Sequence, residues 1–475
     1  MCNILRNRTI MPSETVDMDT MPLRRGHFRV WIVAALGQVA GAGIATLAGI
    51  VIPMLQLILH PELSSFEQGA VACCSLVGIM IGSMLFGAWS DRTGYLLFFR
   101  LCPALVTAAA LFVWLVDTPA SLVVGLFLMG LGIGGDYSLD SDYISEIMPR
   151  RWRLTMVGAA KAASALGSIL FAAVAYLLLK RWDDPHMWNR LWLLVAGLAA
   201  AMLLSRIRFE QSPGWLIARG RTAEAERAVR YFLGPDVRIG EIAARPRHDA
   251  TLQKNAWREL FRRGNRKKIV FSGLPWACEG VGVYGIGIFL PALVMALGLE
   301  SGSEGAYDRI VRSVELTTWI NLCILPGFAL GLWLVNRWYH VRTQTWGFVL
   351  AAAGLGLLLA AYELHAPLWI SVAGFMLFEL FLNAGPHLMT FILPPQIYPV
   401  AERGAGAGLA AACGKAGAVA GVLFLPLLLE RGGVAAVLAA TLLLQLAGAL
   451  ATAVLGRKVL PYEDPDHRPE WHHDR

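Results

Sequence analysis

Charged residues are scarce in this chain of 475 residues. Only 16% of them are Asp, Glu, Lys or Arg, whereas 56% are hydrophobic. A soluble domain carries about 25% charged residues, so the composition argues against a soluble domain and indicates a protein embedded in a membrane. Cysteine is rare as well. The seven cysteines lie mostly in apolar stretches, without the spacing of a metal site, and we interpret them as packing residues.

Signatures of several other protein classes are missing. The first 27 residues lack the apolar core of a signal peptide, and residues 1–27 are predicted to be a disordered cytoplasmic tail. The glycines of Gly130–Gly135 lie in an apolar stretch, where they favour close helix packing and not nucleotide binding. We therefore predict a protein that is not an enzyme and that uses no cofactor and no metal.

Long apolar runs are what the chain has instead. Runs of about 20 apolar residues are long enough to cross a bilayer as helices. The first six predicted spans cover residues 29–58, 69–89, 97–116, 120–145, 154–179 and 188–206, and the second six cover residues 269–297, 312–335, 344–362, 367–393, 405–429 and 434–456. The predicted fold class is an all-α membrane protein with twelve transmembrane helices.

Lys and Arg are absent from the predicted loops at Pro61–Glu67 and Asp117–Ala120 and are concentrated in the alternate loops. Positively charged loops stay on the cytoplasmic side. The rule places both termini in the cytoplasm, together with a central loop over residues 208–268 and a C-terminal tail over residues 457–475. It also accounts for the net charge of +7, so no nucleic-acid partner is predicted.

The two groups of six spans repeat each other. The sequence Glu146-Ile-Met-Pro, followed by Arg153, recurs 250 residues later as Gln396-Ile-Tyr-Pro, followed by Arg403. We predict two parallel six-helix repeats, over residues 28–207 and 269–456. This arrangement places the substrate site between the halves, near the middle of the membrane.

Several motifs resemble those of the major facilitator superfamily. The segment Gly87–Gly94, which contains Asp91 and Arg92, is similar to the signature loop of this superfamily, and Glu210–Ala225 is similar to a pattern of sugar porters and related metabolite:proton symporters. Three shorter motifs resemble the phosphate:proton symporter branch: Gly134–Tyr137, Asn383–Phe391 and Gly408–Lys415. The resemblance implies a secondary transporter that works by rocking of its two halves.

Asp136 is a carboxylate about 15 Å from the predicted cytoplasmic end of its span, counting 1.5 Å per residue. An ionisable group at membrane depth marks an ion or substrate path, and desolvation allows a carboxyl group to hold a proton near neutral pH. The phosphate branch implies proton coupling by Asp136 and substrate contact by Tyr137. The alternative for Asp136 is a helix-packing salt bridge to a Lys or Arg.

Three further charged residues lie nearer the cytoplasmic end: Asp140, Asp142 and Lys161. Lys161 lies in the next span at a similar depth, and we expect a structural Asp140/Asp142–Lys161 pair that acts as a gate. Direct contact of Lys161 with substrate is the alternative.

The seventh span begins with Trp276, Glu279 and Tyr284. Trp276 and Tyr284 match the phosphate branch, which implies that both bind substrate. The acid of that branch falls at Gly280 here, and Glu279 is one position away, a rotation of about 100° on a helix. We assign Glu279 to proton coupling, with a pairing to Lys415 or an Arg as the alternative.

Glu379, Asn383 and His387 are spaced by four and share one helix face. The resemblance implies that Asn383 binds substrate. His387 takes the place of a second Asn, and because it titrates near neutral pH we assign it to binding substrate or relaying protons. A structural role for His387 is the alternative. Lys415, also at mid-membrane, either attracts an anion or neutralises Glu379.

This chain departs from the phosphate branch at two places. The first span, Val30–Leu59, has no acid, and Ser164 stands where the branch has a Gln, so Ser164 is a weaker substrate ligand. These losses favour a small organic acid or another anionic metabolite over inorganic phosphate.

The resemblance also implies a cytoplasmic clasp that works as a gate. Its predicted members are Gly87, Asp91, Arg92, Gly94, Glu146, Arg153 and Arg403. The alternative for the arginines is ordinary anchoring on the cytoplasmic side.

The sequence thus predicts proton-coupled symport of a small anionic metabolite by alternating access. The predicted partners are a small-molecule substrate, protons and the lipid bilayer of the plasma (cell inner) membrane, and the predicted state is a monomer. A sugar, polyol or drug carrier is the alternative transporter, and a non-transporting membrane sensor is the alternative of another class.

Overall fold

The computed structural model describes residues 16–18, 20–59, 62–238, 260–261, 263–298, 305–335, 337–398 and 403–460. Most of these residues are helical. The first half contains α1 (Arg25–Ile58), α2 (Ser65–Thr93), α3 (Tyr95–Val116), α4 (Pro119–Ile147), α5 (Arg153–Ala162), α6 (Ser164–Trp182), η1 (Pro185–Leu191) and α7 (Trp192–Arg206). The second half contains η3 (Arg263–Asn265), α11 (Arg266–Gly280), the π-helical turn η4 (Val281–Ile286), α12 (Leu290–Ala296), α13 (Ala306–Asn321), α14 (Ile324–Val335), α15 (His340–Glu363), α16 (Leu368–Ala384), α17 (Pro386–Ile392), α18 (Pro394–Ile397) and α19 (Arg403–Val459).

Eleven helical segments among the described residues are long and apolar enough to cross a membrane. The last of them, Gly406–Val459, contains non-helical backbone at Gly433 (φ 68°, ψ −174°), where two helices meet in a sharp turn. Counting these two helices separately gives twelve spans. The predicted fold class, all-α with twelve transmembrane helices, is therefore confirmed.

Several spans predicted as single helices are interrupted. The tenth is divided at Gly385, because Pro386 has no amide hydrogen to continue the ladder of the preceding helix. The seventh changes from α-helix to the π-helical turn η4 at Val281. Such turns are common at functional sites and shift the register of the residues that follow.

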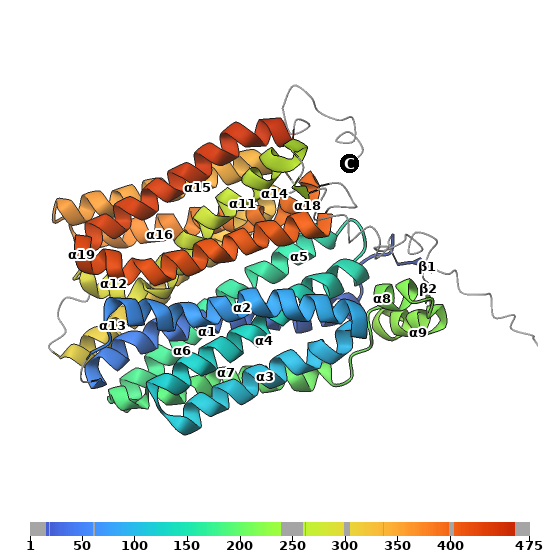
Figure 1. The fold of residues 1–475 in the computed structure, drawn as a ribbon, viewed down its shortest axis with the longest axis horizontal. Helices are drawn as coiled ribbons and strands as arrows, with labels where there is room; N and C mark the ends of the chain where they lie inside the picture. Colours follow the sequence, from blue (N-terminus) through green and yellow to red (C-terminus); the bar gives the residue numbers. More distant parts are fainter. Residues whose placement is uncertain are drawn as a thin grey trace, which may run out of the picture.

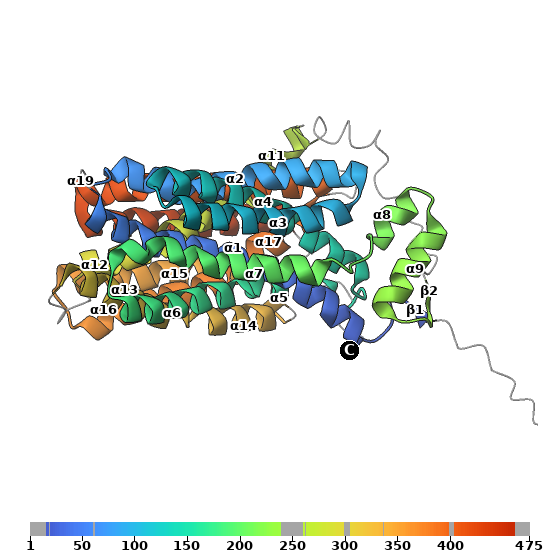
Figure 2. The same ribbon diagram turned by 90° about the horizontal axis from the view of Figure 1, so that it is seen from below.

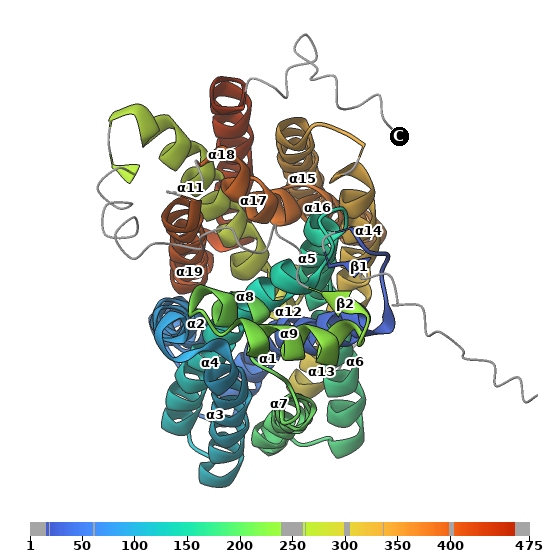
Figure 3. The same ribbon diagram turned by 90° about the vertical axis from the view of Figure 1, so that its right-hand side faces the viewer.

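The helices form two bundles that lie side by side with their long axes roughly parallel (Figure 1). Helices α1–α7 make one bundle, and α11 with α14–α19 makes most of the other, as the view along the helices shows (Figure 3). Helix α13 packs against α6, and α19 packs against α2, so contacts between the halves run along the molecule.

A small helical unit caps one end of the bundles, which we call the α9 end. It consists of α8 (Pro213–Ala218), α9 (Thr222–Leu233) and the strand β2 (Val237–Arg238), and it lies beyond the ends of the long helices (Figure 2). The strand β1 (Val16–Asp17) pairs with β2 in parallel.

The N-terminal segment is fixed to this unit. Arg24 donates to both carboxylate oxygens of Asp236, at 2.8 and 2.6 Å, and Met21 is buried in an apolar cluster that includes Phe232. The predicted disordered tail is thus wrong for residues 16–18 and 20–27, because burial and pairing offset the loss of chain entropy. Residues 1–15 of that prediction lie outside the described residues.

Glycines let α2 and α4 pack backbone to backbone. A Cβ atom at Gly78 or Gly82 would collide with carbonyl groups of α4, and one at Gly130 or Gly134 would collide with carbonyl groups of α2. The glycine-rich stretch 130–135 is therefore a helix-packing surface, as expected from the sequence.

The two halves touch closely at the end opposite α9. Gly49 of α1 lies against the backbone carbonyl of Ile288, and the hydroxyl of Tyr307 donates to the carbonyl of Leu179 at 2.9 Å. These contacts seal the interface between the halves at that end.

Candidate functional site

A polar cavity lies between the two halves. Its volume is about 70 Å³, well below the ~300 Å³ of a pocket that holds a drug-sized ligand. The first half contributes Thr46, Tyr137, Lys161, Ser164 and Ser168, and the second half contributes Tyr284, Asn321, Glu379, Asn383 and His387. A small solute held here would touch both halves at once.

The cavity brings together most of the predicted substrate-binding residues. Five of the seven line it: Tyr137, Ser164, Tyr284, Asn383 and His387. A sixth, Lys415, is adjacent, because its Nζ donates to the hydroxyl oxygen of Tyr284 at 2.8 Å.

Trp276 is not among the lining residues. Its ring packs edge-on against Phe391, with 6.2 Å between the centroids, and covers Gly414. The turn η4 begins at Val281, after Trp276, and contains Tyr284, so it changes the relative orientation of the two side chains. Spacing along the sequence therefore did not predict that only one of them reaches the cavity.

Two lysines from opposite halves lie beside the same tyrosine ring. The Nζ atoms of Lys161 and Lys415 are each 5.6 Å from the ring centroid of Tyr137, and Lys415 is 4.3 Å from that of Tyr284. Within the described part of the chain, neither ammonium group has a carboxylate within 4.0 Å. Each half therefore places beside the cavity an ammonium group that no carboxylate of the described residues contacts directly.

His387 and Glu279 form a buried pair on the wall of the second half. Nδ1 of His387 is hydrogen-bonded to Oε1 of Glu279, and both side chains are less than 10% exposed. The contact joins α11 to α17, the helix that begins directly after the break at Gly385. The partner of Glu279 is thus a histidine, and not the Lys415 or Arg of the alternative.

Asn383 is bonded to Glu379 on the same wall. Its Nδ2 donates to the backbone oxygen of Glu379 at 2.7 Å and to the carboxylate Oε2 at 3.2 Å. The predicted common face of Glu379, Asn383 and His387 is therefore confirmed, since all three line the cavity. A pairing of Glu379 with Lys415 is not formed.

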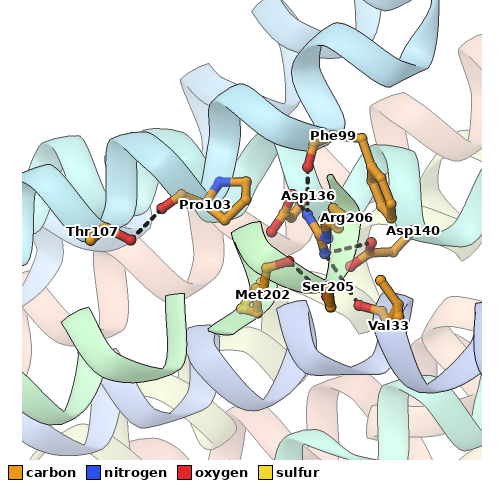
Figure 4. Close-up of polar contacts among 9 residues, drawn as sticks. All are labelled: Val33, Phe99, Pro103, Thr107, Asp136, Asp140, Met202, Ser205 and Arg206. Carbon is orange, nitrogen blue, oxygen red and sulfur yellow. Dashed lines mark hydrogen bonds and ion pairs between the residues drawn. The ribbon is translucent and has the colours of Figure 1, made fainter. Parts of the chain in front are cut away.

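Asp136 lies outside the cavity, in a buried ion network with Arg206 (Figure 4). Oδ1 of Asp136 is 2.6 Å from Nη1 of Arg206, and Oδ1 of Asp140 is 3.3 Å from Nη2. The same guanidinium donates to the carbonyls of Phe99 and Val33, at 3.1 and 3.3 Å. Asp136 thus forms the salt bridge between helices that was the alternative interpretation of this residue, and its partner is an arginine.

The expected pair between Asp140 and Lys161 is wrong. Asp140 is bonded to Arg206 of α7, whereas Lys161 lines the cavity. The predicted depths of the two residues were similar, but depth does not determine which way a side chain points around its helix. The side chain of Asp142 lies outside the described residues.

Two carboxylate oxygens in this network have no hydrogen-bond partner among the described residues. These atoms are Oδ2 of Asp136 and Oδ2 of Asp140. Both lie beside Gly37 of α1, where a Cβ atom would collide with Asp140 and be 3.5 Å from Oδ2 of Asp136. Two carboxylates and one guanidinium sum to one negative charge, which a single proton can neutralise.

Comparison with known proteins identifies the family. The family described as "Sugar (and other) transporter" matches residues 30–455. The chain belongs to this family of major facilitator superfamily transporters. It is therefore a multi-pass membrane transporter and not an enzyme.

Known relatives of this transporter cover nearly its whole length. The inner membrane metabolite transport protein YgcS of Escherichia coli K12 is 29% identical over 447 residues, covering 93% of this chain and 94% of that protein. The repressible high-affinity phosphate permease of Neurospora crassa is 24% identical, covering 88% of this chain and 80% of the permease. The E. coli proton:xylose symporter XylE bound to 6-bromo-6-deoxy-D-glucose superposes with a TM-score of 0.70 at 18% identity, over 92% and 96% of the two chains, which shows a shared fold.

Two of the predicted gating residues of the transporter, Gly94 and Glu146, lie at its α9 end. Gly94 joins α2 to α3 with φ 99°, and a Cβ atom there would collide with Gln211. Glu146 accepts hydrogen bonds from the hydroxyl of Ser212 and, at 3.0 Å, from the amide of Gly214. These contacts fix the end of α4 to the start of α8.

The other gating assignments stay predictions. Arg153 donates to the carbonyl of Met148 at 3.3 Å. Gly87, Asp91 and Arg92 lie within α2, and Arg403 begins α19. The side chains of Asp91, Arg92 and Arg403 lie outside the described part of the chain.

Arg206 is the main functional-site residue that the sequence interpretation missed. It ends the predicted span 188–206, where an Arg is ordinarily a cytoplasmic anchor. The structure buries it completely. Asn321, Thr46 and Ser168 were missed too, and their only signal was a polar side chain within an apolar run.

Proposed function

We propose that this transporter carries a small anionic metabolite, an organic acid or a phosphate-like anion, together with protons. The observation that carries the proposal is the pair of lysines at the cavity. Lys161 and Lys415 come from different halves and are not paired with carboxylates among the described residues. Because an isolated buried charge is costly, an anion that binds between them supplies the missing partner.

The polar lining of the cavity supports the same substrate class. Ser164, Asn321 and Asn383 supply neutral hydrogen-bonding groups beside the lysines. Hydrogen bonds of this kind orient a carboxylate or phosphate oxygen while the lysines supply charge. The similarity to a phosphate permease is in keeping with such a substrate.

The proton partner is assigned to two buried carboxyl groups. Asp136 shares Arg206 with Asp140, and that network has room for one neutralising proton. Glu279 is hydrogen-bonded to His387 beside the cavity. Protonation at either place changes the charge of one half and biases the equilibrium between conformations.

The transport cycle follows from the two-bundle architecture. The bundles 28–207 and 269–456 rock about the cavity, so that contacts such as Tyr307–Leu179 form when one entrance is closed and break when it opens. In the proposed orientation both termini and the loop 208–268 are cytoplasmic, and the monomer resides in the plasma (cell inner) membrane.

The test is uptake into proteoliposomes with an imposed pH gradient. The panel contains succinate, inorganic phosphate, a hexose and a polyol. Lys415→Gln should raise the Michaelis constant for the transported anion by about 10- to 150-fold, the equivalent of one charged hydrogen bond of 1.5–3 kcal/mol. Lys180→Gln is the matched control, because Lys180 is an exposed lysine at the end of α6.

Proton coupling is tested on the same vesicles. Asp136→Asn should abolish accumulation driven by the pH gradient while substrate exchange at equal pH survives. Uptake of the hexose or polyol but of neither anion would refute the anionic substrate. Full pH-driven accumulation by the Asn variant would remove Asp136 from the coupling mechanism.

A further inference from the structure

The carboxyl group of Glu379 lies at the cavity, and the proposed transport cycle assigns it no role. It lies on α16, is 5% exposed and lines the same cavity as Lys161. Its carboxylate accepts one hydrogen bond, from the neutral amide of Asn383 at 3.2 Å. Among the described residues it has no cation within 4.0 Å, in contrast to Asp136, which is bonded to Arg206.

The titratable groups around Glu379 come from several elements. Cys323, in the turn before α14, interacts with Glu379; His387 on α17, Tyr284 on η4 and Lys161 on α5 line the same cavity; and Lys415 on α19 adjoins it through Tyr284. Helices α13 and α15 also pack near α16; α13 carries Asp308 and Arg309 in its first turn and the Arg312–Glu315 pair (2.5 Å). The charged groups of α15, such as Glu363, are at its ends.

The cavity charge depends on one proton. When both are protonated, Lys161 and Lys415 contribute two positive charges, and the His387–Glu279 pair contributes no net charge as an imidazolium with a carboxylate or as a neutral imidazole with a carboxylic acid. An ionised Glu379 would place a negative charge in the space that the anion must occupy. A neutral Glu379 leaves both lysines available, and burial without a cation favours this neutral form.

We infer that Glu379 is a proton-binding site inside the substrate cavity, and that the anion binds only when Glu379 carries its proton. The inference rests on the proposed transport of an anion. Together with Glu279, this site gives the half opposite Asp136 two protonation sites, and Glu379 lines the cavity in which the substrate binds. The proton enters Glu379 from water before the anion binds and returns to water after the anion has left.

The test compares anion affinity across pH in the intact transporter. Glu379→Gln keeps the shape of the side chain and its contact with Asn383 but cannot ionise. Glu363→Gln is the matched control, because Glu363 is exposed at the end of α15. The apparent dissociation constants of succinate and inorganic phosphate are measured between about pH 5.5 and 8.5, by substrate exchange without an imposed pH gradient.

For the wild type and the Glu363→Gln control, the dissociation constant should rise with pH, approaching about tenfold per pH unit where Glu379 is ionised. For Glu379→Gln the slope should fall by up to about tenfold per pH unit relative to the wild type, since one proton is no longer exchanged, while the pH dependence due to the anion's own titration stays common to all variants. Glu379→Asp, a second variant, retains the carboxyl group and should keep the pH dependence with a displaced midpoint.

Two results would overturn the inference. One is an unchanged pH dependence in Glu379→Gln, and the other is a Glu379→Asp variant whose affinity does not respond to pH. A failure of the proposed function looks different: the wild type itself would bind neither anion. The two failures are therefore distinguishable on the same preparation.

Discussion

Replacement of Arg206 by methionine tests the ion network at the centre of the first half. Methionine is similar in length, so the packing volume is largely kept while the charge is removed. Arg206 is fully buried, and its guanidinium holds Asp136 at 2.6 Å and Asp140 at 3.3 Å. The carbonyls of Phe99 and Val33 lose their donors in the same change.

The expected cost is large because two buried carboxylates lose their counter-charge. Removing one partner of a buried ion pair costs about 3–5 kcal/mol. For a unit the size of the first bundle, each kcal/mol lowers the melting temperature by roughly 2–4 °C. The Arg206→Met variant should therefore melt on the order of 6–20 °C below the wild type at neutral pH.

The assay is thermal unfolding of the purified protein in detergent, followed by loss of the monodisperse peak. Arg208→Met is the matched control, since Arg208 is an exposed arginine two positions along the chain. Adding Asp136→Asn and Asp140→Asn to Arg206→Met should restore part of the stability, because the unpaired charges are then gone. A melting temperature like that of the Arg208→Met control, or no recovery in the triple variant, would refute the reasoning.

Two further outcomes are expected. Gly134→Leu should lower stability by about 1–3 kcal/mol or prevent folding, because α4 meets the backbone of α2 there, whereas Gly197→Leu, with no atom within 4 Å of an added Cβ, should melt like the wild type. The hydrogen bond from Arg24 lowers the pKa of Asp236. The N-terminal segment should therefore stay docked above about pH 4 and be released as the pH falls through that lowered pKa. Hydrogen exchange of the segment measures its docking, and a segment that stays docked in Asp236→Asn would contradict the prediction.

The fold was predictable from the sequence because the signals that determine it are local. An apolar run of about 20 residues must be a helix in a bilayer, since no water satisfies its backbone there. The glycines of the stretch 130–135 likewise predicted close helix contacts, and Gly130 and Gly134 make them. The common face of Glu379 and Asn383, four residues apart on α16, followed from helical periodicity.

The sequence also indicated which polar groups matter, since a charged or amide side chain within an apolar run needs a partner or a ligand. Most of the residues singled out on this ground line one cavity or its wall. Membership of the sugar transporter family agrees with this inference.

Only the tertiary structure decided which polar groups are partners. Asp140 and Lys161 were expected to pair, yet Arg206, from a helix 66 residues further along the chain, holds Asp140. Glu279 is bonded to His387, 108 residues away. Partner choice depends on helix rotation and on breaks such as Gly385 and the π-helical turn η4, which shift side chains around the axis. Because these rotations are set by packing between helices distant in sequence, the sequence determined where polar groups enter the membrane, and the folded bundle determined which of them are left for a substrate.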